Sequence, residues 1–319
     1  MEKKAIDILC VGLTVCDIIA KPVSRAVFDV DSTKIDMIKV ASGGDALNAA
    51  VNMAKLGVKV ALAGGVGQDM MGEFLRGEAA RAGVDTGGLK ASADVSTSTS
   101  IVLVDESGER RFIYCGKANN EFSPEDVGDA ALKSARIVHL GSAMALAGFE
   151  GGALAEFFRK AKDAGAITSM DVTWDSTGRW LGKIEEALYY TDLFMPSFNE
   201  AKHITGLRDP EAMADFFSKY GLQALVVKLG SDGCLVTDYR ERRVIPAFDV
   251  GVPADTTGAG DAFVSGFLAG TIKGMDLYER GLLGNAAAAC CVTEVGATAG
   301  TRNWDETITF MRTARRKKE

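Results

Sequence analysis

The sequence has few of the residues that hold transition metals. It contains only two histidines, His139 and His203, and its six cysteines include no C-x-x-C pair. A zinc site held by the protein is therefore excluded, and any divalent metal needs oxygen ligands. No secretory leader follows Met1, so we expect a cytoplasmic chain whose cysteines are buried free thiols. His139 ends an apolar run, which is typical of a core histidine.

Positive charge is also scarce, with 36 Lys+Arg against 43 Asp+Glu and a formal net charge of −7. Nucleic-acid binding needs clustered cations, and the one basic cluster, Arg312 with residues 315–318, belongs to a C-terminal tail that we expect to be solvated and frayed. The longest apolar stretches, such as residues 286–292, are too short to cross a bilayer. We therefore expect neither a nucleic-acid partner nor a membrane partner.

Short β-branched runs alternate with amphipathic stretches that end in glycine. This alternation predicts right-handed βαβ units, and hence one α/β domain with a mostly parallel, doubly wound sheet covered by helices on both faces. Ligands then belong at the carboxyl ends of the strands. Strands are predicted at residues 8–11, 58–63, 137–140, 167–170, 193–195 and 224–229, and helices at 71–82, 152–164 and 211–220, with a further helix start at Ser123.

Two stretches interrupt the alternation. Residues 18–40 are extended and show little helical period, and residues 99–104 and 111–114 are joined by an Asp105-Glu-Ser-Gly108 turn, which predicts a β-hairpin. We expect these strands to form a small sheet that projects from the main domain. No internal repeat or long linker is present, so the small sheet is an excursion of a single domain over residues 1–319.

The sharpest motif is Asp255-Thr-Thr-Gly-Ala-Gly-Asp261, which runs into an apolar helix. A glycine-rich turn that opens a helix points free backbone N–H groups at an anion, and Gly258, Ala259 and Gly260 are small enough to admit a phosphate. Asp261, in the first helical turn, could act as a general base for a hydroxyl beside that phosphate. The alternative is an ordinary turn with an acid that favours a helix N-terminus.

A second motif, Ser42-Gly-Gly-Asp-Ala-Leu-Asn48, also precedes a helix, and a Gly64-Gly-Val-Gly-Gln-Asp69 segment follows. Gly43 and Gly44 let the backbone approach a small ligand, and Asn48 can donate to and accept from hydroxyl groups. Asp17 can offer a carboxylate to the same hydroxyls. Each of these residues alone is more often a turn, a cap or a surface acid.

Together the two motifs, in this order and near the two ends of the chain, resemble the signatures of the ribokinase-like (PfkB) carbohydrate kinase family. The resemblance covers almost the whole chain. It implies a three-layer fold of the ribokinase type with a β-sheet lid, formed from residues of about 15–40 and 97–118, that closes over a sugar and often makes a homodimer.

The resemblance also implies a role for each matching position. Asp261 would be the base that takes the proton from a sugar hydroxyl as it attacks the γ-phosphate of ATP, with Gly258, Ala259 and Gly260 as the anion hole. Sugar contacts are implied for Asp17, Gly43, Gly44 and Asn48, and ATP contacts for Lys228, Gly230, Ser197 and Asn285. Glu200 would reach Mg²⁺ through water, and Asp255, Thr257 and Gly296 would form a potassium site like that of many relatives.

Several departures from the family pattern matter, and one is Gly300, which lies near a position that supplies a hydroxyl to the cation in some relatives and so leaves potassium dependence open. The Asn-x-x-Glu motif is Ser197-Phe-Asn-Glu200 here, which predicts an altered magnesium site, and Glu200 could instead cap the following helix. Gly141-Ser142 stands where ribokinases often have Glu, and Asp45 replaces a common basic residue, so ribose is disfavoured. The Gly-Gly-Asp-x-Leu-Asn segment is similar to that of 2-keto-3-deoxygluconate kinases, yet Asp45 would repel an acidic sugar.

The leading hypothesis is therefore an ATP-dependent and Mg²⁺-dependent kinase, with K⁺ as a candidate further cofactor, that phosphorylates a primary hydroxyl of a neutral sugar or polyol. A nucleoside kinase of the same family and, because of Ser197, a non-catalytic ligand-binding relative stay open as alternatives. A nicotinamide dehydrogenase is disfavoured, because Gly12-Leu-Thr-Val-Cys follows the first strand instead of a G-x-G-x-x-G turn.

Overall fold

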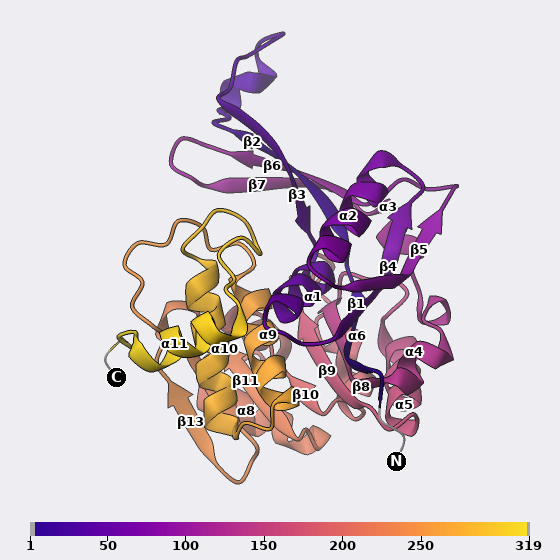
Figure 1. Ribbon diagram of the computed structural model, residues 1–319, viewed down its shortest axis with the longest axis vertical. Coiled ribbons are helices and arrows are strands. Elements are labelled where there is room, and N and C mark those ends of the chain that lie inside the picture. The colour runs from indigo at the N-terminus through magenta and orange to yellow at the C-terminus, as the bar shows by residue number, and fades with distance from the viewer. Residues whose placement is uncertain (1–3, 318–319) are drawn as a thin grey trace.

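The computed structural model describes residues 4–317, which form a large sheet between two layers of helices and a smaller sheet that projects from it (Figure 1). This architecture confirms the predicted α/β fold. Within the described residues the large sheet has nine strands in the order β13-β12-β11-β10-β9-β8-β1-β4-β5. They are β1 (Ile6–Gly12), β4 (Val60–Gly67), β5 (Asp85–Ser92), β8 (Ala135–Ala143), β9 (Ile167–Val172), β10 (Leu193–Phe194), β11 (Ala224–Lys228), β12 (Cys234–Thr237) and β13 (Arg242–Ile245).

The strands from β5 to β11 are parallel, and β12 and β13 continue the sheet in antiparallel fashion. Strand β1 is buried on both faces: Leu9 and Val11 pack into one core, and Ile8 and Cys10 pack into the other. This double burial explains why the strand is a continuous apolar run. His139, opposite Cys10 on β8, is a buried core histidine as predicted, with Nδ1 3.0 Å from Ser169 Oγ.

Helices cover both faces of the large sheet. The core on one face includes residues of α4 (Asp129–Ser134), α5 (Gly151–Asp163), α6 (Leu181–Leu188), α7 (Phe198–Thr205) and α8 (Pro210–Phe217). The core on the other face includes residues of α1 (Asp45–Lys55), α2 (Met70–Arg81), α9 (Ala259–Ile272) and α10 (Leu277–Cys291). The short α3 (Lys117–Glu121) follows the small sheet, and α11 (Trp304–Thr313) packs on α10.

The predicted helices lie within a few residues of their expected positions, and side-chain caps fix the start of two of them, α2 and α8. For example, Asp69 accepts a hydrogen bond from the Gly72 N–H and starts α2. The helix start at Ser123 is wrong in extent: its capping box closes only a single 3-10 turn, Pro124–Asp126. Val127 is extended, so the helix cannot propagate, and α4 begins only at Asp129.

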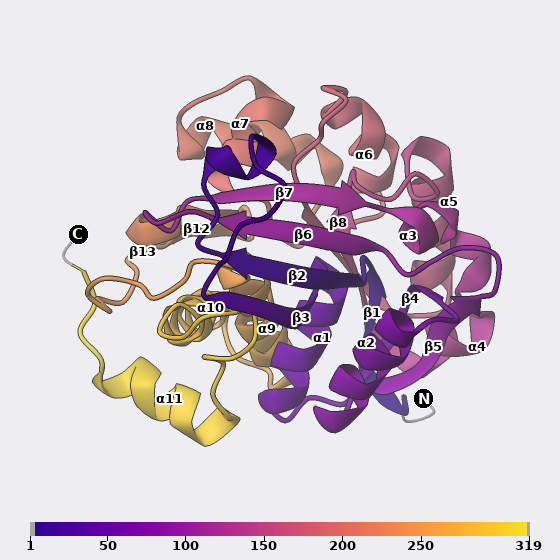
Figure 2. The ribbon, with the colours of Figure 1, turned by 90° about the horizontal axis from the view of Figure 1, so that it is seen from above.

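The small sheet has the order β3-β2-β6-β7 and consists of β2 (Val15–Lys21), β3 (Met37–Gly43), β6 (Thr99–Val104) and β7 (Arg110–Cys115). The predicted hairpin is β6–β7, and the irregular stretch before it supplies β2 and β3. Seen from above, the small sheet lies across the middle of the molecule (Figure 2). Strand β1 leads directly into β2, so the small sheet stands at the carboxyl end of β1.

The two faces of the small sheet differ in character. The strand register places Val40, Ile18, Ile101 and Ile113 side by side on one face, and Val40, Ile101 and Ile113 are exposed there. We call this the outer face. Successive side chains alternate along a strand, so the opposite, inner face carries Asp17.

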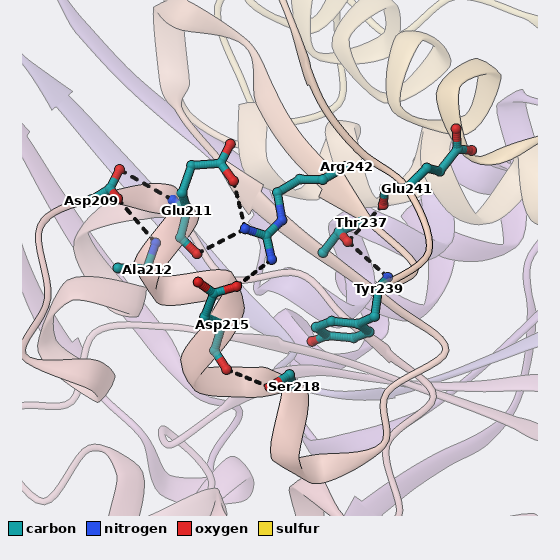
Figure 3. Close-up of polar contacts among 9 residues, drawn as sticks. All are labelled: Asp209, Glu211, Ala212, Asp215, Ser218, Thr237, Tyr239, Glu241 and Arg242. Carbon is teal, nitrogen blue, oxygen red and sulfur yellow. Dashed lines mark hydrogen bonds and ion pairs between the residues drawn. The ribbon is translucent and has the colours of Figure 1, made fainter.

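The antiparallel edge of the large sheet is tied to α8 by one arginine. Arg242 on β13 donates from Nη1 to Glu211 Oε2 and from Nη2 to Asp215 Oδ1, each at 2.7 Å (Figure 3). Both acids are at least half exposed, so each pair is expected to stabilise the fold by less than about 1 kcal/mol. These contacts fix the orientation of the edge hairpin.

Two surface expectations are wrong. Cys115, at the end of β7, is exposed, unlike the other five cysteines. The basic tail is not frayed up to Lys317: the Asp249 N–H donates to Arg315 O at 2.9 Å and the Lys317 N–H donates to Ala247 O at 2.8 Å. Lys318 lies outside the described residues. Between residues 4 and 317, no helix combines the length and apolar character that a membrane span requires.

Candidate active site

A pocket of about 550 Å³ lies where the carboxyl ends of β9 and β11 meet the N-terminus of α9. This is the edge at which parallel α/β sheets bind ligands. The predicted site residues that line the pocket all come from the second half of the chain, and Asp45 at the start of α1 joins them. Its lining includes Asp45, Asp171, Ser197, Glu200, Lys228, Gly230, Gly258, Ala259, Gly260, Asp261 and Asn285.

The glycine-rich turn forms an anion-binding N-terminus for α9. Gly258 is the N-cap and has φ = 73°, and a Cβ there would lie 2.5 Å from Ala297 Cβ, so only glycine fits. The Ala259 N–H donates to Thr256 O at 3.3 Å. Among the described residues, the N–H groups of Gly260 and Asp261 donate to no protein acceptor, which leaves two donors for a phosphate at the positive end of the helix.

Asp261 and Asn48 are brought together from positions 213 residues apart in the sequence: Asn48 Nδ2 donates to Asp261 Oδ2 at 2.8 Å. Both side chains are more than nine-tenths buried. Asn48 Oδ1 has no partner within the described chain, so it is available to a hydroxyl donor. Burial first, and then the nearby charge of Asp45, raise the pKa of Asp261 well above its ordinary value, whereas the bond from Asn48 opposes that rise.

Asp17 and Gly43 form the second part of the site, on the small sheet. They lie on the adjacent strands β2 and β3, and a Cβ at Gly43 would lie 2.2 Å from Asp17 Oδ2, so the missing side chain makes room for the carboxylate. Burial raises the pKa of Asp17 to about 6, with Arg110 opposing the rise. All four predicted sugar contacts, Asp17, Gly43, Gly44 and Asn48, lie outside the pocket lining, but Asn48 of α1 is hydrogen-bonded to Asp261, which does line it.

Lys228 supplies a positive charge beside the anion hole. It ends β11, its Nζ donates to Asp171 Oδ2 at 2.6 Å, and a Cβ at Gly260 would lie 3.5 Å from the same Nζ. Burial would lower the pKa of Lys228, but the carboxylates of Asp171 and Glu200 raise it above its ordinary value. The lysine therefore stays charged next to the position of a bound phosphate.

Asp171 directly follows the strand predicted at residues 167–170, and its role as the partner of Lys228 was not predicted. An acid near the carboxyl end of β9 could have indicated this role, because the carboxyl ends of β9 and β11 lie at the same edge of the sheet. Burial raises the pKa of Asp171, and the Lys228 ammonium opposes that rise.

Ser197 and Glu200 form a capping box at the start of α7. Ser197 Oγ accepts from the Glu200 N–H at 3.3 Å, and Glu200 Oε2 accepts from the Ser197 N–H at 2.7 Å. The alternative in which Glu200 caps a helix is therefore confirmed. Both residues nevertheless line the pocket, and in the described chain Glu200 Oε1 accepts no hydrogen bond, so it can still bind a water. The magnesium role of Glu200 stays a prediction.

Asn285 and Gly230 line the pocket from α10 and from the turn after β11. The amide of Asn285 is already engaged: Nδ2 donates to Ile245 O at 3.0 Å and to Pro246 O at 3.3 Å. Asn285 thus holds the segment that leads into the pocket wall at Ala247 and Phe248. The ATP contact implied for Asn285 stays a prediction.

The three predicted potassium ligands also lie together. Asp255 Oδ1 accepts from the Thr257 N–H at 2.7 Å, and Asp255 Oδ2 accepts from the Gly296 N–H at 2.9 Å. Asp255 also forms an ion pair with Arg110 of β7. Burial would raise the pKa of Asp255, but these donors hold it below its ordinary value. Sequence reasoning missed Arg110, because nothing local in the hairpin indicates a contact with a motif so distant in the chain.

No cluster of three His, Cys, Asp or Glu side chains that could hold a metal is present in residues 4–317. The pocket instead offers oxygen atoms of separate carboxylates, such as the unpaired Oε1 of Glu200. This donor set fits a hydrated Mg²⁺ reached through water, because Mg²⁺ keeps several waters and is usually bound together with substrate phosphates.

Comparisons with known proteins give a consistent result. The model of the family described as pfkB family carbohydrate kinase matches residues 5–304. An uncharacterized sugar kinase of Archaeoglobus fulgidus is 32% identical over 251 residues, which cover 78% of this chain and 98% of that protein. The crystal structure of a ribokinase from Thermotoga maritima has a TM-score of 0.82 at 26% identity and covers 97% of this chain and 100% of its own. A fructokinase from Xylella fastidiosa with bound ATP has a TM-score of 0.81 at 26% identity and covers 97% and 98%.

Proposed function

Because this chain belongs to the pfkB family of carbohydrate kinases, we propose that it transfers the γ-phosphate of ATP to a primary hydroxyl of a neutral sugar or polyol. The observation that carries the proposal is the bond between Asn48 and Asp261 at the N-terminus of α9. The bond joins the buried Asp261 carboxylate to Asn48, whose Oδ1 has no partner in the described chain. The N–H groups of Gly260 and Asp261 are free at the same helix start, which supports proton transfer beside a bound phosphate.

In this proposal Asp261 accepts the proton of the sugar hydroxyl as that oxygen bonds to the γ-phosphorus. The bond from the γ-phosphorus to the bridging oxygen breaks, and ADP leaves. The raised pKa of Asp261 suits a proton acceptor, because a stronger base takes the proton more readily. The N–H groups of Gly260 and Asp261, with the Lys228 ammonium, stabilise negative charge on the transferring group, which is where most of the catalysis of phosphoryl transfer lies.

Mg²⁺ would neutralise charge on the ATP phosphates. Glu200 would hold it through water, and Ser197 is proposed to contact the nucleotide from the start of α7. Gly230 and Asn285 would bound the rest of the nucleotide. Lys228 is the buried cation of this pocket, and the carboxylates of Asp45, Asp171 and Glu200 surround it, so ATP needs the additional positive charge of the metal here.

A neutral acceptor follows from the charges around the sugar contacts. Asp17, Asp45 and Asp261 are all acids, and they can accept hydrogen bonds from hydroxyl groups. Arg110 is the nearby cation, and its guanidinium is already paired with Asp255. A phosphorylated or carboxylated sugar would therefore meet like charge without a free cation to offset it.

We further propose that the small sheet acts as a lid and that its outer face makes a homodimer. That face exposes Ile38, Val40, Ile101 and Ile113, with exposed fractions between 40% and 70%. A contiguous apolar patch of this kind marks an interaction surface. The cytoplasmic location expected from the sequence stays a prediction.

The test is an assay of ADP release with MgATP across neutral sugars, polyols, sugar phosphates, sugar acids and nucleosides. Turnover with a neutral sugar or polyol supports the proposal, provided that the Asp261→Asn variant binds ATP but does not turn over. Turnover confined to nucleosides would replace the proposal with a nucleoside kinase. Tight binding of a sugar with no ADP release under any condition would identify a non-catalytic relative.

A further inference from the structure

Arg110, the first residue of β7, connects the small sheet to the glycine-rich motif. The register of β2, β6 and β7 aligns Asp17, Ser100 and Tyr114, and alternation along β7 places Arg110 on the same inner face as Tyr114. From that face the Arg110 guanidinium reaches Asp255 and forms an ion pair with it. The Arg110 side chain is 27% exposed and that of Asp255 is 3% exposed, so the pair is largely shielded from water.

Asp255 in turn holds two loops in place. Its two oxygens accept from the backbone N–H groups of Thr257 and Gly296, at 2.7 Å and 2.9 Å. The residues that follow these two donors, Gly258 and Ala297, pack directly against each other, since a Cβ on Gly258 would lie 2.5 Å from Ala297 Cβ. The position of the Asp255 carboxylate therefore sets the position of the anion hole.

The same loops were predicted to bind potassium, and their free oxygen atoms can be checked against that prediction. Protein sites for K⁺ are built from carbonyl oxygens that replace the hydration shell of the ion. Here Cys291 Sγ lies 3.6 Å from Thr257 O and 3.3 Å from Ala297 O, and its one hydrogen can be donated to either oxygen. Lys55 Nζ donates to Thr298 O at 2.7 Å. The Cys291 thiol and the Lys55 ammonium thus compete with a cation for the carbonyl oxygens of these loops.

The positive charges near Asp255 also disfavour a potassium ion at these loops. The guanidinium of Arg110 already lies at Asp255, and the ammonium of Lys55 lies at the loop after Gly296, so a further cation would meet two positive charges. Of the side-chain oxygens in that loop, the buried Thr301 Oγ1 has no partner in the described chain, but one hydroxyl cannot replace a hydration shell. The residues present do not fit a potassium ion.

We propose that Arg110 is a positioning residue that supplies the positive charge at Asp255, so that the small sheet, and not a potassium ion, holds the anion hole in order. This inference rests on the proposed kinase function. Arg110 acts through Asp255 and not on the reacting atoms. Because Arg110 belongs to the small sheet, the anion hole is complete only when the small sheet covers the sugar contacts. The movement that closes the small sheet over the acceptor then also orders the anion hole. Phosphate transfer to water is disfavoured, because the anion hole is disordered while the site is open.

The test compares the wild type with Arg110→Gln, Arg110→Lys and Arg111→Gln. Arg111 is the matched control, since it is adjacent on β7, its side chain is 73% exposed and it pairs with Glu109. The melting temperature, kcat and both KM values are measured in potassium chloride and in tetramethylammonium chloride at equal ionic strength. Melting needs no turnover, so this arm remains informative even if the sugar kinase proposal fails.

The wild type is expected to show the same melting temperature and the same kcat in the two salts. Arg110→Gln should lower kcat by about 10- to 100-fold because the anion hole shifts, Arg110→Lys should recover part of that loss, and Arg111→Gln should match the wild type. Since Arg110 acts through Asp255, Arg110→Gln should cost nothing further in an Asp255→Asn background.

Three results would overturn the inference. The first is a wild type that melts higher or turns over severalfold faster in potassium chloride, because a bound ion stabilises the folded state. The second is an Arg110→Gln variant that cannot be distinguished from Arg111→Gln. The third is a double variant whose losses multiply, which would mean that Arg110 contacts the substrates directly.

Discussion

Asn48 Nδ2 donates a 2.8 Å hydrogen bond to Asp261 Oδ2, so the first turn of α1 contacts the first turn of α9. Asn48 belongs to the motif expected to contact the sugar, and Asp261 belongs to the motif expected to contact the phosphate. The bond therefore joins acceptor recognition to proton transfer. It also favours the charged form of Asp261 against burial and against the charge of Asp45.

The Asn48→Ala variant should shift the pH profile of kcat. Loss of a donor to the carboxylate raises the pKa of Asp261 further, so the base becomes protonated at higher pH and the acid limb of the profile moves to higher pH. Asn52→Ala is the matched control, because Asn52 lies one turn further along α1, is fully buried, and its side chain makes no hydrogen bond in the described chain. An acid limb that moves equally in both variants would contradict this role of Asn48.

Asp17 should set the pH dependence of acceptor binding. Its pKa is raised to about 6 by burial, so it is a carboxylate above that pH and becomes protonated as pH falls through about 6. Since a protonated carboxyl accepts hydroxyl hydrogen bonds less well, the KM for the acceptor should rise below pH 6 in the wild type. In Asp17→Asn the acceptor KM should be high and independent of pH over this range. If the acceptor KM of Asp17→Asn still rises below pH 6, the pH dependence of acceptor binding belongs to another group.

The sequence was sufficient for the fold because the local signals and the tertiary structure agree. The Asp69 cap of α2 and the apolar strand β1 each have a pattern that only one type of element satisfies. The prediction at Ser123 was wrong because a capping box specifies where a helix starts but not how far it continues. The order of the basic tail was missed because its partner is the segment 247–249, far away in sequence.

In the candidate site, too, some residues could be predicted from local motifs and others could not. Gly258, Asp261 and Asn48 could be assigned from two compact motifs, in which glycine spacing and a helix start restrict the geometry. The partners Lys228–Asp171 and Arg110–Asp255 could not, because each pair joins residues on separate elements whose proximity only the topology creates. No periodicity or local spacing encodes such a contact.

Lys228→Met should separate the electrostatic role of Lys228 from its structural one. Removing the ammonium leaves Asp171 without its partner, and loss of one member of a buried pair costs about 3–5 kcal/mol of folding free energy. The Lys228→Met/Asp171→Asn variant should recover much of that stability in urea unfolding. Its kcat should still be about 10²- to 10³-fold below that of the wild type, because the charge beside the anion hole is absent. Recovery of activity along with stability would show that Lys228 is only structural.

Ser197 tests the departure from the family motif through stability. Ser197→Ala removes the hydroxyl that accepts from the Glu200 N–H and should lower the free energy of unfolding by about 1 kcal/mol. Ser197→Asn keeps a capping side chain and should stay within a few tenths of a kcal/mol of the wild type, as urea unfolding will show. Equal losses in the two variants would mean that the cap is not what Ser197 contributes.

The central claim is that Asp261 is the base in transfer of the γ-phosphate of ATP to a sugar hydroxyl. The most direct measurement follows the wild type and Asp261→Asn by ³¹P NMR with MgATP and the acceptor that the screen identifies, with ATP affinity measured in parallel by calorimetry. The account predicts equal amounts of sugar phosphate and ADP from the wild type. It predicts a rate at least about 10²- to 10⁴-fold lower from Asp261→Asn, with ATP affinity unchanged. An Asp261→Asn variant that forms sugar phosphate at the rate of the wild type would contradict the account.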